Sequence, residues 1–109
     1  MSWHLFLDDE REPAHPRPDT VVCRTAAEAR REVSGRGCPA EMDLDHDLGD
    51  GEDAMGFLRW FADEVLDGRA VIPDGFSFAV HSQNPVGRRN IEGFMKGLLR
   101  AVADSPSPQ

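Results

Sequence analysis

Short apolar segments followed by polar or proline-rich sequence predict the β-strands of this chain. Residues 41–45 alternate acidic positions with Met42 and Leu44, which indicates a strand with one buried face. The place of this segment between two predicted helices favours a central strand. The other predicted strands are rich in leucine, β-branched or aromatic side chains, as buried strands are. They are residues 5–7, 20–23 and 76–80.

The connection after the first strand differs from the connection after the second. Residues 10–19 contain three prolines, which exclude a crossover helix in this segment. After the second strand, Thr25 and Glu28 form a capping box, which predicts the start of a helix. We expect this helix to end near Ser34 and Gly35.

Two further helices are predicted from apolar residues at helical spacing. One runs from Glu52 to about residue 66. The other covers residues 85–101, with Asn84 as its cap and Pro85 in its first turn. The apolar positions of these two helices are Met55, Leu58, Ala62, Val65, Leu66, Ile91, Phe94, Met95, Leu98, Leu99 and Val102.

The alternation of strands and helices predicts a small α/β fold. Such an order implies a mostly parallel sheet with right-handed crossovers, flanked by three helices. If the strand order is 2-1-3-4, the first and third strands are neighbours. A chain of 109 residues suits one domain, which we place at residues 1–104. We expect residues 105–109 to form a flexible tail.

The charge excludes some classes of partner. Twenty Asp and Glu residues against twelve Lys and Arg residues give a net charge of −8. This balance argues against a broad nucleic-acid or anionic-membrane surface, because both partners require a positive protein surface. No apolar run is long enough to cross a bilayer, and the first residues turn acidic too early for a secretory signal. We therefore expect a cytoplasmic protein with reduced cysteines.

The acidic residues gather after the first and third predicted strands. Eleven of the twenty lie in residues 8–12 and 41–53, and the second of these segments contains no Lys or Arg. With the strand order 2-1-3-4, both clusters meet at the carboxyl edge of the sheet. Carboxylates this close repel one another unless a cation lies between them, which predicts a divalent ion, magnesium or manganese. The predicted ligands are Asp8, Asp9, Asp45 and Asp47.

The other acidic residues of these two clusters are not predicted to bind the ion. Asp43 faces one side of the sheet or the other, and the pattern leaves its direction open. The segment from residue 43 begins like an EF-hand calcium loop, but Leu48 and Ala54 replace the glycine and glutamate that such a loop requires. An EF-hand is therefore excluded. The acids expected to be solvated or to cap helices are Glu10, Glu12, Asp50, Glu52 and Asp53.

Two histidines and one helix start are predicted at the same edge. His46 and His81 can exchange a proton near neutral pH, so they are candidates for general base and general acid, in an order left open. The free N–H groups of the helix that follows Asn84 favour an anion. The alternative is that Asn84 only caps this helix and that its arginines are solvated. The predicted phosphate-binding residues are Ser82, Asn84, Arg88 and Asn90.

Three blocks of sequence, in order, resemble the cyclic-phosphate-processing receiver-like domain. The blocks read LFLDDEREP, LDHDLG with GED, and HSQNPVGRRNI, and the resemblance covers nearly the whole chain. It implies a derivative of the response-regulator receiver fold, which is flavodoxin-like, and a role in processing cyclic phosphates. In this resemblance, Asp8 and Asp9 correspond to the metal-binding acids of a receiver, and Asp45 corresponds to its phosphoacceptor.

The chain also departs from true receivers. A proline-rich segment replaces the first crossover helix, and no fifth strand with a Lys-Pro pair follows. The only lysine, Lys96, lies in a predicted helix. His46 and His81 are additions to the receiver pattern. Because the lysine that holds an acyl phosphate is missing, phosphosignalling through Asp45 is disfavoured.

These observations predict a metal-dependent phosphoesterase that acts on a cyclic phosphate of a nucleotide or an RNA end. A divalent ion would polarise the phosphoryl oxygens and activate water. His46, His81 and Asp45 are the predicted catalytic residues. The alternatives are a signalling receiver phosphorylated on Asp45 and a module that only binds a nucleotide or a protein. The oligomeric state is left open.

Overall fold

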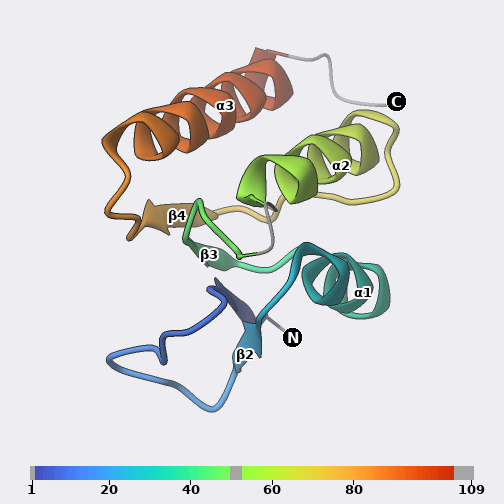
Figure 1. Ribbon diagram of the computed structural model, residues 1–109. Helices are drawn as coiled ribbons and strands as arrows, with labels where there is room; N and C mark the ends of the chain where they lie inside the picture. Colours follow the sequence, from blue (N-terminus) through green and yellow to red (C-terminus); the bar gives the residue numbers. More distant parts are fainter. Residues whose placement is uncertain (1, 50–52, 105–109) are drawn as a thin grey trace.

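The computed structural model describes residues 2–49 and 53–104 (Figure 1). The described strands form one parallel sheet in the order β2-β1-β3-β4, so the predicted α/β fold and strand order are confirmed. No fifth strand occurs in these two ranges. The elements are β1 (His4–Leu7), β2 (Thr20–Cys23), α1 (Ala26–Arg36), β3 (Glu41–Leu44), α2 (Ala54–Leu66), β4 (Ser77–Val80) and α3 (Pro85–Asp104).

All three helices cover the same face of the sheet, and the connection from β1 to β2 runs over the other face (Figure 1). The right-handed crossover rule explains the positions of α1, α2 and the β1–β2 connection. The chain moves in one direction across the sheet from β2 to β3 and from β3 to β4, but in the opposite direction from β1 to β2. The prolines of the β1–β2 connection leave it without a helix, as predicted. The fold therefore has a single helical layer.

The core lies between the sheet and this helical layer. Leu5 and Leu7 of β1 point toward the helices and are fully buried, whereas Phe6 lies on the opposite face. Burying an aliphatic or aromatic side chain contributes about 1.5–3 kcal/mol, so the three helices bind the sheet mainly through such contacts. The other large core residues include Met42, Leu44, Val80, Phe57, Leu58, Phe61, Ile91, Met95 and Leu98.

The helix boundaries differ from prediction at two C-terminal ends. The predicted end of α1 near Ser34 and Gly35 is wrong, because Gly35 remains helical and Gly37 ends the helix with a φ of 87°. A positive φ is the conformation in which glycine ends a helix at little cost. α3 continues past residue 101 to Asp104.

Two helices begin directly after a residue whose side chain caps the first turn. Thr25 caps α1 by accepting a hydrogen bond from the Glu28 N–H, and Asp53 caps α2 in the same way from the Met55 N–H. The predicted tail at residues 105–109, and the acids at positions 50 and 52, lie outside the described residues. Within the described ranges, none of the helices has the length and apolar character needed to cross a bilayer.

Candidate functional site

The register of the sheet aligns the first residue after each strand. Leu7 pairs with Cys23 on one side and with Leu44 on the other, and Leu44 pairs with Val80. These four residues form a buried row. The next residue of each strand therefore belongs to a second row, the carboxyl-edge row, which consists of Arg24, Asp8, Asp45 and His81.

Backbone hydrogen bonds hold this row in place. The N–H of Asp8 donates to the Cys23 carbonyl at 3.1 Å. The N–H of Asp45 donates to the Leu7 carbonyl at 2.9 Å, and that of His81 to the Leu44 carbonyl at 3.0 Å. The predicted meeting of the two acidic clusters is thus a consequence of parallel pairing. His81, on the neighbouring strand, joins them.

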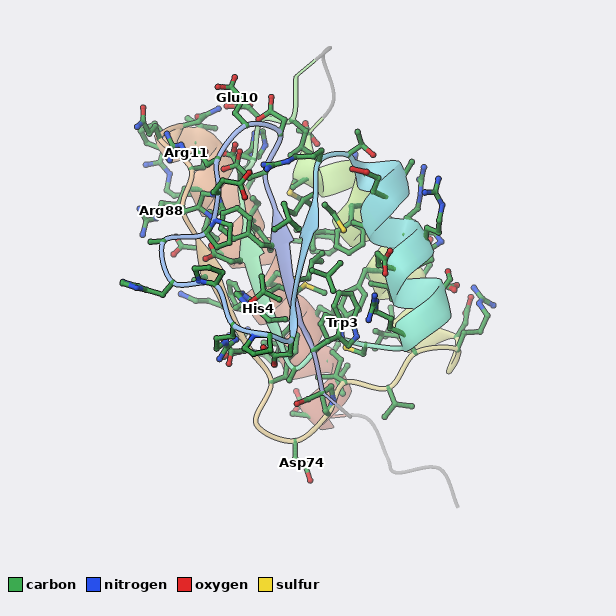
Figure 2. The ribbon with its side chains drawn as sticks, turned by 90° about the horizontal axis from the view of Figure 1, so that it is seen from below. Trp3, His4, Glu10, Arg11, Asp74 and Arg88 are labelled. Carbon is green, nitrogen blue, oxygen red and sulfur yellow. The ribbon has the colours of Figure 1, made fainter. Side chains whose placement is uncertain are left out.

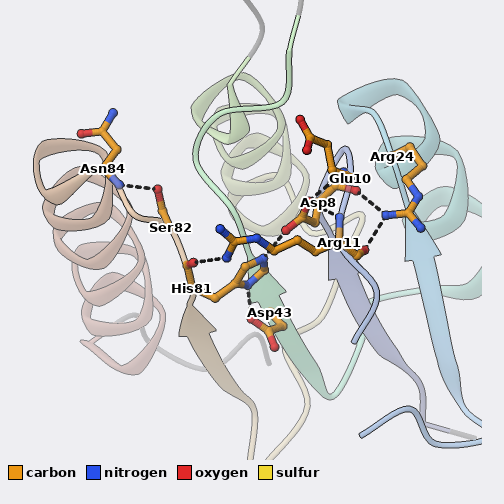
Figure 3. A network of polar contacts seen from close by, with 8 residues as sticks. All are labelled: Asp8, Glu10, Arg11, Arg24, Asp43, His81, Ser82 and Asn84. Carbon is orange, nitrogen blue, oxygen red and sulfur yellow. Dashed lines mark hydrogen bonds and ion pairs between the residues drawn. The ribbon is translucent and has the colours of Figure 1, made fainter. Parts of the chain in front are cut away.

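Asp8 is the buried centre of the carboxyl-edge row. Its side chain is 1% exposed. Oδ1 accepts hydrogen bonds from the N–H groups of Glu10 at 2.8 Å and Arg11 at 2.9 Å, and Oδ2 lies 2.8 Å from Nε2 of His81 (Figure 3). Burial alone would raise the pKa of Asp8, but these hydrogen bonds outweigh it and hold the pKa below its ordinary value. Asp8 is therefore ionised at neutral pH.

His81 joins Asp8 to a second carboxylate. Its Nδ1 lies 2.5 Å from Oδ1 of Asp43 (Figure 3). Its ring stacks on Phe6 with 5.0 Å between centroids. Partial burial would lower the pKa of His81, but the bonds to Asp43 and Asp8 outweigh it and raise the pKa. Both ring nitrogens face carboxylate oxygens, an arrangement that favours the imidazolium, in which both nitrogens are donors.

Asp45 completes a group of possible metal ligands. Its carboxylate has no hydrogen-bond partner among the described residues, and burial together with the charge of Asp8 raises its pKa. One oxygen of Asp8, one oxygen of Asp45 and one ring nitrogen of His81 all lie within 4.8 Å of one another. Two carboxylates and an imidazole are suitable ligands for a divalent cation. These residues therefore fit the ion that the sequence predicts.

A pocket of about 240 Å³ opens beside this group. Arg11 is the one basic side chain among its described lining residues. Figure 2 shows Glu10 and Arg11 at one end of the strands and Asp74 at the other end. The pocket thus combines many carboxylates with one cation and several neutral polar groups. Its lining consists of Asp8, Asp9, Glu10, Arg11, Asp45, Asp47, Gly49, Ser82, Gln83 and Asn84.

The start of α3 forms the neutral side of the pocket. Oδ1 of Asn84 accepts hydrogen bonds from the N–H groups of Val86 and Gly87, both at 3.1 Å, so its predicted capping role is confirmed. The buried Ser82 hydroxyl accepts a hydrogen bond from the Asn84 N–H at 3.1 Å. Nδ2 of Asn84 reaches toward Oδ2 of Asp47 at 3.5 Å.

His46 is not among the described residues that line this pocket. Its Nδ1 lies 2.9 Å from Oδ1 of Asp47, which does line the pocket. The hydrogen bond from His46 holds the pKa of Asp47 below its ordinary value. The His46 ring also lies against Gly87 of α3. His46 and Asp47 therefore form a pair of which only the carboxylate reaches the pocket.

Not all predicted site residues lie in the pocket. Asp8, Asp9, Asp45, Asp47, Ser82 and Asn84 line it. Arg88 and Asn90 are exposed on α3 and outside its lining. Nε of Arg88 lies 3.9 Å from Oε2 of Glu92, one turn along the helix.

The sequence patterns did not identify several residues of this site, which are Asp43, Arg11 and the further lining residues Glu10, Gly49 and Gln83. Asp43 binds His81, and Arg11 lines the pocket. Arg24 fixes the turn that carries Arg11, because its Nη1 donates to the carbonyls of Asp8 at 3.1 Å and Arg11 at 2.5 Å. The position of Arg11 two residues after Asp9, in the turn that follows β1, was the available signal for it.

A family model described as the cyclic-phosphate processing receiver domain matches residues 3–97. The match includes every residue of the carboxyl-edge row and the whole described lining of the pocket. Comparisons with curated proteins and with solved structures gave no significant match.

Proposed function

The chain belongs to the cyclic-phosphate processing receiver family, and on this premise we propose that it is a metal-dependent phosphoesterase. Its substrate would be a cyclic phosphate on a nucleotide or an RNA end, and its product the open phosphate monoester. One observation supports the proposal most directly. A possible ion site of Asp8, Asp45 and His81 adjoins a small pocket, which is also lined by the guanidinium of Arg11 and by the residues at the start of α3.

Asp8 and Asp45 are the proposed carboxylate ligands of the ion. The other two predicted ligands, Asp9 and Asp47, line the same pocket but do not belong to the group of Asp8, Asp45 and His81. A bound divalent ion supplies Lewis-acid polarisation of the phosphoryl oxygens and lowers the pKa of a bound water. The raised pKa of Asp45 supports this assignment, because a carboxylate beside other carboxylates gains most from a cation.

The proposed phosphate contacts come from both sides of the pocket. Arg11 supplies positive charge from one side, and Ser82 and Asn84 supply neutral polar groups from the other. The pocket, at about 240 Å³, is smaller than the roughly 300–1,000 Å³ of pockets that enclose a drug-sized ligand. It therefore suits a phosphate-bearing end whose remaining atoms lie outside, which agrees with a nucleotide or RNA terminus.

Hydrolysis requires a proton for the departing sugar oxygen. Water adds to phosphorus and releases one proton to solvent, one of the two ester P–O bonds breaks, and the leaving oxygen takes up a proton. We assign this proton to His46, with Asp47 as the relay: Asp47 takes the proton from Nδ1 of His46 and passes it to the leaving oxygen, because its carboxylate both binds His46 and lines the pocket. Both ring nitrogens of His81 lie close to carboxylates, at 2.5 and 2.8 Å, whereas Nε2 of His46 has only a longer contact of 3.9 Å, to Oδ2 of Asp53. His81 is therefore the less available of the two histidines for the substrate.

The test is turnover of a 2′,3′-cyclic nucleotide by the purified chain with manganese or magnesium, followed by ³¹P NMR. We expect the monoester to accumulate only with the ion, and Asp45→Asn to abolish turnover. Asp74→Asn is the matched control, since Asp74 is exposed at the opposite end of the strands, and it should turn over normally.

Two other results would contradict the proposed enzymatic function. Metal-independent nucleotide binding without turnover would indicate a binding module. Labelling by acetyl phosphate that Asp45→Asn prevents, again without turnover, would indicate a signalling receiver.

A further inference from the structure

Nε2 of His81 already lies at the distance that separates two ligands of one ion. It is 2.8 Å from Oδ2 of Asp8, and both atoms belong to the group within 4.8 Å that includes Asp45. In an octahedral site with bonds of about 2.1 Å, neighbouring ligand atoms lie about 3 Å apart. An ion that lies to one side of the line between these two atoms could therefore bind both of them in place of the hydrogen that joins them.

Two contacts outside this group fix the direction of the ring. Asp43 binds Nδ1 at 2.5 Å, so Nε2 is the nitrogen that points to Asp8. Phe6 stacks on the ring at an interplanar angle of 7°, which fixes the ring plane. In metal sites, a histidine ligand usually binds a carboxylate or carbonyl through its other nitrogen, and this partner sets its orientation and basicity. Asp43 has that relation to His81.

We propose that His81 is a nitrogen ligand of the ion, through Nε2, and that Asp43 is the residue that positions it. This inference rests on the proposed metal-dependent function. When the ion binds, the Nε2 proton leaves to solvent and the nitrogen lone pair binds the cation. A site with two carboxylates and one imidazole prefers manganese or another first-row transition ion to magnesium, because magnesium favours oxygen ligands.

The test is electron spin echo envelope modulation of the full chain loaded with Mn²⁺. We expect a ¹⁴N coupling that changes to a ¹⁵N coupling when the histidines are labelled with ¹⁵N. This measurement needs no substitution, so it does not depend on the folding of a variant. His81→Gln should remove the coupling, whereas the matched variant His46→Gln should retain it, because His46 does not belong to the ligand group.

Titration of Mn²⁺ by EPR tests the positioning residue. Asp43→Ala should weaken Mn²⁺ binding by about 10–100-fold, as removal of such an orienting partner does in other metal sites. Asp43→Asn retains an acceptor for Nδ1, so it should restore part of this loss.

The possible failures are distinguishable. If Mn²⁺ binds and Asp45→Asn prevents binding, but no histidine nitrogen couples to it, the ion site stands and the role of His81 is refuted. Unchanged Mn²⁺ affinity in Asp43→Ala would refute the role of Asp43. If no Mn²⁺ binds at millimolar concentration, both this inference and the metal-dependent function are overturned.

Discussion

The His46 ring packs against the backbone of Gly87 so closely that the site has no room for a side chain at position 87. A Cβ atom there would lie 2.4 Å from Cγ of His46 and 2.7 Å from its Nδ1. Protein carbon atoms do not approach so closely, so the ring would have to move. Because the same Nδ1 binds Asp47, the first turn of α3 determines where the His46–Asp47 pair meets the pocket.

Gly87→Ala should therefore damage the site and the fold together. We expect the free energy of unfolding to fall by about 1–3 kcal/mol, as for other overpacked positions, and turnover to fall with it. Gly93→Ala is the matched control in the same helix, since a Cβ at Gly93 meets nothing within 4 Å. It should stabilise the chain by roughly 0.5–1 kcal/mol. Equal urea unfolding midpoints for the two variants would contradict the packing argument.

Arg11 and Arg88 provide a direct test of which arginine binds the phosphate. Arg11 lines the pocket, whereas Arg88 is exposed beside Glu92. Loss of a hydrogen bond to a charged group costs about 1.5–3 kcal/mol. We therefore expect Arg11→Gln to lower kcat/KM for a cyclic nucleotide by about 10–100-fold, and Arg88→Gln to change it little. The reverse order would restore Arg88 as the phosphate-binding residue.

His81 should make stability depend on pH in the ion-free protein. Its pKa is raised above the ordinary 6.5, so its contribution to folding is complete below that value. The contribution is lost as the pH rises through the raised native pKa. Urea unfolding between pH 5 and pH 9 should show this loss, and His81→Gln should not.

An NMR titration of the ring adds a second measurement. The pKa of His81 should be lower in Asp43→Ala than in the unmodified chain, because one of its two carboxylates is gone. An unchanged ring pKa would show that Asp43 does not act on His81 in solution.

Arg24 should control the rigidity of the turn at Asp8. Its guanidinium binds the Asp8 and Arg11 carbonyls and the Glu12 carboxylate, a set that the single ammonium of lysine does not span. Arg24→Lys should speed hydrogen exchange at the N–H groups of Glu10 and Arg11 by about 5–30-fold, equivalent to 1–2 kcal/mol. Arg31→Lys, an exposed position on α1, should leave these rates unchanged.

Most of the fold was predictable because its signals are local. The prolines of residues 10–19 exclude a helix, and the caps at Thr25 and Asn84 locate two helix starts. The end of α1 was not predictable from the sequence. Gly35 and Gly37 can both end a helix, and only the backbone conformation shows that Gly37 is the one with positive φ. Local propensity predicts where an element can end, while packing decides where it does.

The site was predictable where residues directly follow strands. Asp8, Asp45 and His81 converge for that reason. Asp43 lies within β3, and its partner depends on where the His81 ring turns, which no local pattern encodes. The position of Arg88 depends on the rotational phase of α3, so a residue near the helix start still points away from the pocket.

The length and register of the strands determine which residues form the carboxyl-edge row. Each strand has four residues, and the row consists of the residues that follow them. The connections between strands can lengthen or shorten without moving the row, because register is set within the sheet. A single residue inserted into β3 would instead send alternate side chains to opposite faces and take Asp45 out of line with Asp8. Variation in chain length is therefore tolerable in the loops of this fold and is excluded from its strands.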